Sequence, residues 1–225
     1  MNTIHRSADR GQTKLDWLES RHSFSFGDYQ NPKRINCGTL CVLNEDWIEP
    51  ASGFPRHPHR NMEIITIILS GFLEHKDSMG NKRVITTGEV QHMSAGTGIV
   101  HAEYNPSKKE KTHLLQIWIE PKLRNIPPEY CQKKFLLEKN KLQILVSGTR
   151  NTDSLFMQQD AIITRGFFDE ESSYIPEKKR NIFLFVITGK VKVNEVEIGE
   201  GDSIETDEMI KIIPQKEVDF LLIEV

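Results

Sequence analysis

Two pairs of polar side chains, each separated by one residue, impose the strongest constraint on the fold. His57 and His59 lie in the segment F-P-R-H-P-H-R, and His101 and Glu103 lie in G-I-V-H-A-E-Y. Side chains at positions i and i+2 share a face only in an extended chain, because on a helix they point about 200° apart. Each pair lies beside a run of residues that is typical of a β-strand. We therefore expect both pairs to lie on strands.

The first pair is held extended by its own neighbours. Pro55 and Pro58 bias the residues before them toward extended geometry, which keeps residues 56–59 strand-like. If both pairs face the interior of one barrel, three imidazoles and a carboxylate converge on one point. Such a set of ligands suits a divalent transition metal, with Fe or Mn expected and Ni, Co, Cu or Zn as further options. One metal per chain follows.

The rest of the chain is typical of an all-β protein. Short apolar runs such as E-I-I-T-I-I-L-S-G and V-D-F-L-L-I-E-V are separated by turn signals every eight to twelve residues. A proline-rich stretch after residue 120 predicts a boundary between an N-terminal metal-binding domain, 1–125, and a C-terminal domain, 126–225. Four aromatic side chains near the N-terminus are expected to plug a barrel or cover a sheet edge: Trp17, Phe24, Phe26 and Tyr29.

The second half of the chain is a weak repeat of the first. The run I-I-L-S-G, which ends at Gly71, can be superposed on F-V-I-T-G, which begins at Phe185. With the matching glycines aligned, the positions of His57 and His101 are occupied by Ile175 and Pro214. We therefore expect the C-terminal domain to keep the scaffold and to lack the metal ligands.

Other polar residues are candidates for supporting roles. Glu63 has the parity of the histidine pair, and we expect it to support the ligands through hydrogen bonds. His75 either faces the cavity, where it contacts substrate, or is a solvated strand residue. Either His113 or Gln116 can reach the pocket, because they lie on opposite faces of a strand; His75 and Gln116 are the candidate substrate contacts. His22 is interpreted as structural or as a surface residue.

Composition excludes several classes of function. The net charge of -3 and the pI near 6.3 give no reason to expect nucleic-acid or membrane binding through bulk charge, and no basic helix or DNA-recognition motif is present. No apolar run approaches a membrane span and no hydrophobic signal core is visible, so we expect a cytoplasmic protein. Three cysteines without a C-x-x-C pattern predict buried reduced thiols: Cys37, Cys41 and Cys131.

The two paired motifs resemble the cupin motifs. The first, G-x5-H-x-H-x3,4-E-x6-G, is matched by His57, His59, Glu63 and Gly71, and the second, G-x5-P-x-G-x2-H-x3-N, by Gly88, Gly96, His101 and Asn105. The sequence departs from both: Gly53 is two positions closer to the histidines, one extra residue precedes Gly71, Ser94 replaces the proline, and two extra residues precede His101. These departures, together with H-S-F-S-F-G-D-Y, F-P-R-H-P-H-R and S-A-G-T-G-I-V-H-A-E, resemble the pirin family of bicupins.

The resemblance implies a fold and a set of ligands. The fold is two stacked antiparallel β-barrels, each a double-stranded β-helix, with a few short helices. The metal ligands of the family are the histidines of H-P-H and the His and Glu of H-x-E, which fall on His57, His59, His101 and Glu103. Glu63 then stays outside the set of ligands.

The resemblance also implies two functions. Bacterial members of the family are reported as quercetin 2,3-dioxygenases, which implies a flavonol substrate, dioxygen, and ring opening to a depside with loss of carbon monoxide. In that reaction Glu103 serves as the general base for the flavonol 3-hydroxyl. Animal members are iron-binding nuclear co-regulators, which implies instead a non-enzymatic metal- or redox-sensing protein that regulates a partner protein.

Overall fold

The regular secondary structure of the described residues is almost entirely β-strand. The computed structural model describes residues 2–150, 153–175 and 180–225. Over these residues the one helix is a 3-10 turn, Ser7–Asp9 (η1), so the described part of the chain has no helix that could cross a membrane. The chain divides into an N-terminal unit, residues 11–135 and 155–159, and a C-terminal unit, residues 1–10, 136–154 and 160–225.

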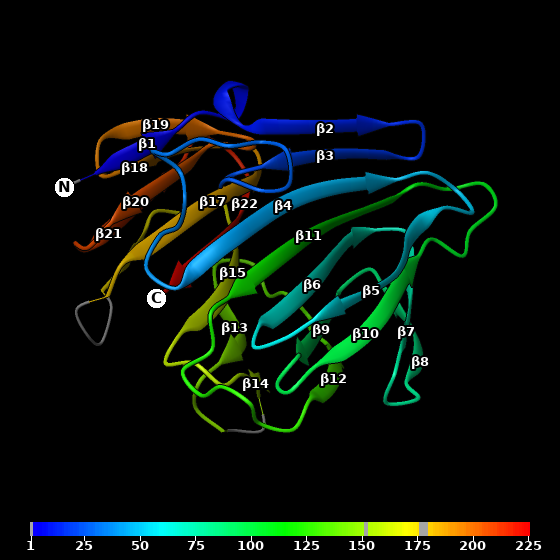
Figure 1. Ribbon diagram of the computed structural model, residues 1–225. Helices are drawn as coiled ribbons and strands as arrows, with labels where there is room; N and C mark the ends of the chain where they lie inside the picture. The colour runs from blue at the N-terminus through cyan, green and yellow to red at the C-terminus, as the bar shows by residue number, and fades with distance from the viewer. Residues whose placement is uncertain (1, 151–152, 176–179) are drawn as a thin grey trace. The chain divides into compact units, whose positions relative to one another are not determined.

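The N-terminal unit consists of two antiparallel sheets (Figure 1). In strand order, the larger sheet contains Glu129–Lys134 (β12), Glu89–Ser94 (β9), Glu63–Ser70 (β6), Thr112–Ile119 (β11), Leu40–Ile48 (β4), Leu18–His22 (β3) and Gly11–Leu15 (β2). The smaller sheet contains Gly53–His59 (β5), Ile99–Tyr104 (β10), Phe72–Asp77 (β7) and Lys82–Thr86 (β8), and Leu155–Phe156 (β14) also belongs to this unit.

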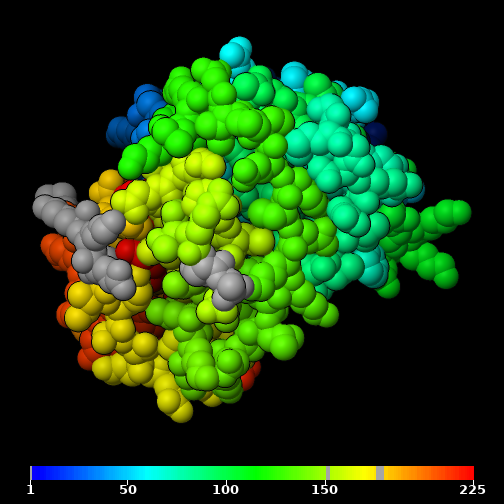
Figure 2. Space-filling view, turned by 90° about the horizontal axis from the view of Figure 1, so that it is seen from below, coloured from blue at the N-terminus to red at the C-terminus, as the bar shows by residue number. Residues whose placement is uncertain are grey.

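Side chains of both sheets share the core of the N-terminal unit. Ile48, Ile68 and Leu114 of the larger sheet pack with Leu73 and Ile85 of the smaller sheet, and all five are buried. The first six residues of β6 are buried, as its β-branched sequence predicts for a central strand. On the face shown in Figure 2, the cyan and green atoms of this unit form a continuous layer.

The C-terminal unit repeats this arrangement of two antiparallel sheets. In strand order, one sheet contains Thr3–His5 (β1), Ser203–Thr206 (β20), Ile182–Thr188 (β17), Val218–Glu224 (β22), Ile162–Phe168 (β15) and Leu142–Ser147 (β13). The other contains Ser172–Tyr174 (β16), Ile210–Pro214 (β21), Lys190–Val193 (β18) and Val196–Gly199 (β19). Its core is one apolar cluster to which both sheets contribute, including Leu184, Val191, Ile212 and Phe220.

The boundary between the units differs from the one expected at residue 125. Strand β12 pairs with β9, which places residues 126–135 in the N-terminal unit. Strand β1 pairs with β20, which places the first ten residues in the C-terminal unit. The proline-rich stretch is therefore a loop inside the N-terminal unit. The boundary between the units is set by pairing between strands that are distant in the sequence. Local composition does not predict such pairing.

Two glycines support the internal repeat. Gly71 follows β6 with φ +80°, and Gly189 follows β17 with φ +89°, a region that favours glycine. A Cβ at Gly71 would lie 2.6 Å from the carbonyl oxygen of Lys111, and one at Gly189 would lie 2.3 Å from that of Glu217. Each unit thus uses one glycine to let the chain turn against the start of its neighbouring strand, β11 or β22.

Candidate metal centre

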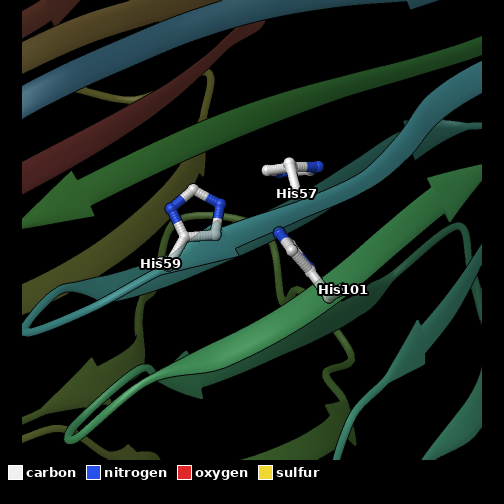
Figure 3. Close-up of side chains that lie close together, drawn as sticks. All are labelled: His57, His59 and His101. Atoms are coloured by element: carbon white, nitrogen blue, oxygen red, sulfur yellow. The ribbon is translucent and has the colours of Figure 1, made fainter.

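Two strands of the smaller N-terminal sheet bring three histidines together. Strands β5 and β10 pair antiparallel with His101 opposite His57, and His59 shares the face of His57. The three imidazoles project from these strands toward one point (Figure 3). Their ring centroids are 4.4 to 4.8 Å apart, and one nitrogen from each ring lies within 4.8 Å of the others. Three imidazole nitrogens this close together would hold a divalent transition metal.

Local backbone features place these strands. Gly53 approaches β10 so closely that a Cβ there would lie 2.2 Å from the carbonyl oxygen of Glu103. Pro55 and Pro58 are tolerated because β5 is the edge strand of its sheet, where a missing N–H costs no ladder bond. The register between β5 and β10 shifts between His101 and Glu103, which marks a β-bulge or local irregularity beside these ligand positions.

The hydrogen bonds around the site leave several nitrogen and oxygen atoms available to bind a metal. Nδ1 of His57 lies 2.8 Å from the carbonyl oxygen of Pro55; donation of its proton there leaves Nε2 as the metal-binding nitrogen. Nε2 of His101 and Oε1 of Glu103 are buried and have no hydrogen-bond partner. Unpartnered buried polar atoms are costly, and a cation satisfies a nitrogen and a carboxylate oxygen together. The residues present therefore fit a divalent metal.

Glu103 is held on the His101 side of the histidine group. Its Oε2 accepts a hydrogen bond from Nε2 of Gln116 at 3.0 Å, and Oε1 of Gln116 accepts one from Oγ1 of Thr66 at 3.0 Å. A ligand atom of Glu103 lies within 4.8 Å of His101 and of His75, so these three form a second group of possible ligands. His101 belongs to both groups.

The environment keeps two of the imidazoles neutral. Burial, with the neighbouring imidazoles of His101 and His57, lowers the pKa of His59 to about 4 against the attraction of Glu103. Burial, with His57 and His75, lowers the pKa of His101 to about 3. Neutral imidazole is the form that binds a metal, so these rings need lose no proton at neutral pH.

A cavity of about 480 Å³ opens beside the histidines. This volume is in the range of pockets that hold small organic molecules. The wall is mostly apolar, and its large side chains are Leu15, Trp17, Leu18, Phe26, Phe54, Ile64 and Trp118. Its polar groups include the three histidines, Glu103 and Gln116.

Comparison with known proteins identifies the family. Residues 4–119 match the family model described as Pirin, and residues 144–225 match one described as the quercetinase C-terminal cupin domain. The chain belongs to the pirin family.

Relatives of this pirin span nearly its whole length. The quercetin 2,3-dioxygenase of Escherichia coli O157:H7 is 40% identical over 225 residues, which cover 98% of this chain and 97% of the relative. A pirin-like protein of Caulobacter vibrioides is 38% identical and covers 92% of each chain. The crystal structure of the bacterial pirin YhhW from Escherichia coli in complex with nickel(II) matches with a TM-score of 0.96 and 38% identity, over 100% of this chain and 99% of that one. The expected bicupin fold is thereby confirmed.

Of the two residues predicted to contact substrate in this pirin, one lies on the cavity wall and the other does not. Gln116 lines the cavity, whereas His75 does not. His75 is fully buried, where Nε2 lies 3.0 Å from Oδ2 of Asp77 and its ring packs 4.7 Å from that of Tyr130. His75 is paired with Glu103 in the strand register and lies 3.5 Å from His101, so it is neither on the cavity wall nor solvated, which were the two expected placements. His113 faces the other way and stacks on Trp47.

Glu63 also departs from its expected place beside the ligands. Parity counted along an unbroken strand gave it the face of His59, but β5 ends at His59 and β6 begins at Glu63 in the other sheet. Between them the chain turns at Asn61, which has φ +50°. The carboxylate of Glu63 instead meets three partners: His92, Ser94 and the backbone N–H of Gln158.

Sequence reasoning missed a polar group on the cavity wall. Ser20, His22, Asn44 and Asp46 line the cavity of this pirin together. Nδ1 of His22 lies 2.8 Å from Oδ1 of Asn44, and Ser20 donates to Asp46. Asn44 and Asp46 are two residues apart in L-C-V-L-N-E-D-W-I, so in a strand they share a face. This spacing could have been used to predict the polar group from the sequence.

Proposed function

We propose that this pirin is a metal-dependent dioxygenase that opens the heterocyclic ring of flavonols such as quercetin. The observation that carries the proposal is a cluster of three imidazoles on the wall of an apolar cavity large enough for a small aromatic molecule. The relatives named quercetin 2,3-dioxygenase and the nickel-bound structure of a bacterial pirin support it.

The metal in this proposal is one divalent transition ion per chain. His57, His59 and His101 hold it, and Glu103 completes the set through its unpartnered Oε1. Iron or manganese is the expected metal in the cell, and nickel is a further option because a relative binds it. When bound, the ion supplies Lewis acidity toward an enolic hydroxyl and a redox-active centre for dioxygen.

Glu103 is the general base in the proposed reaction. Its Oε1, which has no hydrogen-bond partner, would accept the proton of the flavonol 3-hydroxyl. Gln116 positions the carboxylate by donating to Oε2, and Thr66 fixes Gln116. One flavonol and one dioxygen then give one depside and one carbon monoxide. C3 leaves with its own oxygen as carbon monoxide, so both atoms of dioxygen stay in the depside.

The cavity wall orients the substrate. Trp17, Phe54 and Trp118 offer aromatic faces and edges to a planar flavonol and keep water from the reacting carbons. At the polar part of the wall, Asn44 and Asp46 are suited to the hydroxyl groups of a polyphenol. Substrates without hydroxyl groups are therefore expected to bind more weakly.

Metal removal tests the proposal. The purified protein is treated with a chelator, dialysed, and assayed for quercetin loss and carbon monoxide release under air, before and after addition of Fe(II), Mn(II) or Ni(II). We expect turnover to disappear with the metal and to return with at least one ion. Turnover that survives complete demetallation would overturn the mechanism.

Two variants sharpen the assay. Glu103→Gln keeps the shape of the side chain and removes the base, so kcat is expected to fall about 100-fold or more. His113→Gln changes a histidine that stacks on Trp47 and does not line the cavity, and it is expected to keep full activity. Equal activity of both variants would exclude Glu103 as the base.

A further inference from the structure

A second cluster of reactive groups lies on the reverse face of the larger N-terminal sheet. Strands β6, β9 and β12 are neighbours, with Cys131 opposite His92 and Ser94 opposite Glu63. Residues that are directly opposite share a face, and neighbours along a strand alternate. Because Ile64 lines the metal cavity, Glu63 and the residues aligned with it point to the other face. This cluster is therefore separate from the metal centre.

Glu63 anchors the cluster as an ionised carboxylate. It is fully buried, and its Oε1 accepts a hydrogen bond from Ser94 at 2.6 Å. Its Oε2 lies 2.7 Å from Nε2 of His92 and 3.1 Å from the backbone nitrogen of Gln158. Burial raises the pKa of Glu63, but the hydrogen bonds and charge of these partners outweigh it, and the pKa is lowered overall.

His92 connects this carboxylate to a thiol. Its Nδ1 lies 3.5 Å from Sγ of Cys131, on the side of the ring away from Glu63. Burial lowers the pKa of His92, while hydrogen bonds and charge interactions with Cys131 and Glu63 raise it to about 9. At neutral pH the ring is therefore an imidazolium with one N–H toward Glu63 and the other toward the sulfur. A cationic donor beside a sulfur favours its thiolate form.

Of the other two cysteines, Cys41 has contacts that differ from those of Cys131, and it serves as the internal control. Cys37 is buried, with 4% of its surface exposed. Cys41 is half-buried like Cys131, but burial and the nearby Glu120 raise its pKa to about 11. Its sulfur lies 3.5 Å from the carbonyl oxygen of Trp118 and 4.0 Å from Sδ of Met62. All three cysteines are free thiols, as expected, but only Cys37 is buried, whereas Cys41 and Cys131 are half-buried.

We propose that Cys131 is a site of oxidation by small hydroperoxides, with His92 as its proton donor and Glu63 as the residue that positions His92. The thiolate sulfur attacks one peroxide oxygen, so that an S–O bond forms and the O–O bond breaks. The proton of His92 Nδ1 passes to the leaving oxygen. The sulfur is oxidised to a sulfenic acid, and hydrogen peroxide is reduced to water. This inference does not depend on the proposed dioxygenase function.

Site-resolved labelling of the full-length protein tests the proposal. The protein is exposed to stoichiometric hydrogen peroxide with dimedone, which captures sulfenic acids, and each cysteine is quantified by peptide mass spectrometry. We expect Cys131 to be labelled about tenfold faster than Cys41 at pH 7, because reactivity follows thiolate character. Equal rates at the two sites would overturn the proposal. This comparison is made within the wild-type chain and needs no variant.

Variants and a chelator separate the cluster from other causes. His92→Asn and Glu63→Gln are expected to slow labelling of Cys131 about tenfold. Cys41→Ser, as the matched control, leaves Cys131 unchanged. Labelling that vanishes when a chelator is present would assign the oxidation to bound metal and reject the cluster.

Discussion

The two units use equivalent positions for opposite purposes. In the N-terminal unit, Thr66 of β6 lies opposite Gln116 of β11. In the C-terminal unit, Leu184 of β17 lies opposite Leu222 of β22, at the same place relative to Gly71 and Gly189. The polar pair supports Glu103 through hydrogen bonds, whereas the leucine pair belongs to a continuous apolar core.

The difference shows what the frame itself requires. In the C-terminal unit two antiparallel sheets pack around a continuous apolar core. In the N-terminal unit two antiparallel sheets enclose a cavity whose wall includes histidines. Burial of this apolar core stabilises the C-terminal unit. The N-terminal unit keeps a cavity and unpartnered buried polar atoms, which are costly features that a ligand or metal would offset. The N-terminal unit thus combines an apolar core with site chemistry, whereas the interior of the C-terminal unit is an apolar core.

The largest expected effect comes from breaking the apolar pair. Leu222→Ala removes a fully buried side chain from the core of the C-terminal unit and leaves a void. We expect a loss of about 3 kcal/mol in the free energy of unfolding, measured by urea denaturation. Leu136→Ala, at a leucine that is 79% exposed, is the control and should change stability little. Equal small effects would mean that the leucine pair does not carry the core.

Removal of a histidine should affect metal binding without a comparable loss of fold. His101→Ala takes away the residue that both groups of possible ligands share. We expect the affinity for Ni(II) or Zn(II) to fall about 100-fold or more, measured by competition with a chromophoric chelator. His113→Ala is the control because His113 does not line the cavity. Unchanged affinity in His101→Ala would place the metal elsewhere.

A single substitution makes the polar pair resemble the leucine pair. Gln116→Leu removes the donor to Oε2 of Glu103 and places an apolar group against Thr66. We expect metal affinity to fall about tenfold. The free energy of unfolding of the metal-free protein should fall by about 1 to 3 kcal/mol, because the buried hydroxyl of Thr66 and Oε2 of Glu103 lose their partner. Gln116→Glu would be informative beside it, because it keeps the volume and places a second carboxylate next to Glu103. Unaltered metal binding in both variants would show that Glu103 needs no positioning by Gln116.

Local sequence patterns were enough to predict the strands. The extended geometry that puts His57 and His59 on one face is read over a few residues, and the prolines of β5 reinforce it. The all-β fold follows in the same way, from alternation and turn signals along the chain. The meeting of this pair with His101 depends on the pairing of β5 with β10, and it was expected only on the condition that both pairs face one barrel.

Features that depend on distant strands could not be read from the chain. Glu63 does not share the face of His59, because the strand ends before Asn61. Asn61 adopts the left-handed backbone conformation, and the chain passes there to the other sheet. The half-buried state of Cys131 depends on the pairing of β12 with β9. The pairing of β1 with β20 joins residues about two hundred positions apart, and no local pattern announces it.

The smallest expected effect is a difference in acid sensitivity between the units. In the metal-free protein the pKa of His59 is about 4 and that of His101 about 3, below the ordinary value of 6.5, mainly because of burial. Between pH 6.5 and 4 the unfolded chain therefore binds more protons than the folded chain, and stability falls as the pH falls. The contribution of these groups is complete above pH 6.5. We expect a loss of about 1 kcal/mol per pH unit, with a smaller share from the partly exposed His59.

Tryptophan fluorescence isolates this effect in the N-terminal unit. All three tryptophans, Trp17, Trp47 and Trp118, lie in that unit. The urea midpoint, recorded with a chelator present, should be lower at pH 5 than at pH 7. The reason is that His59 and His101 bind protons in the unfolded chain at pH 5 but not in the folded chain. The double variant His59→Gln, His101→Gln should lose part of this dependence, since glutamine does not titrate. If the urea midpoint of the variant depends on pH as strongly as that of the wild type, other groups titrate in this pH range. The difference between the histidine-lined cavity and the apolar core would then not affect acid stability.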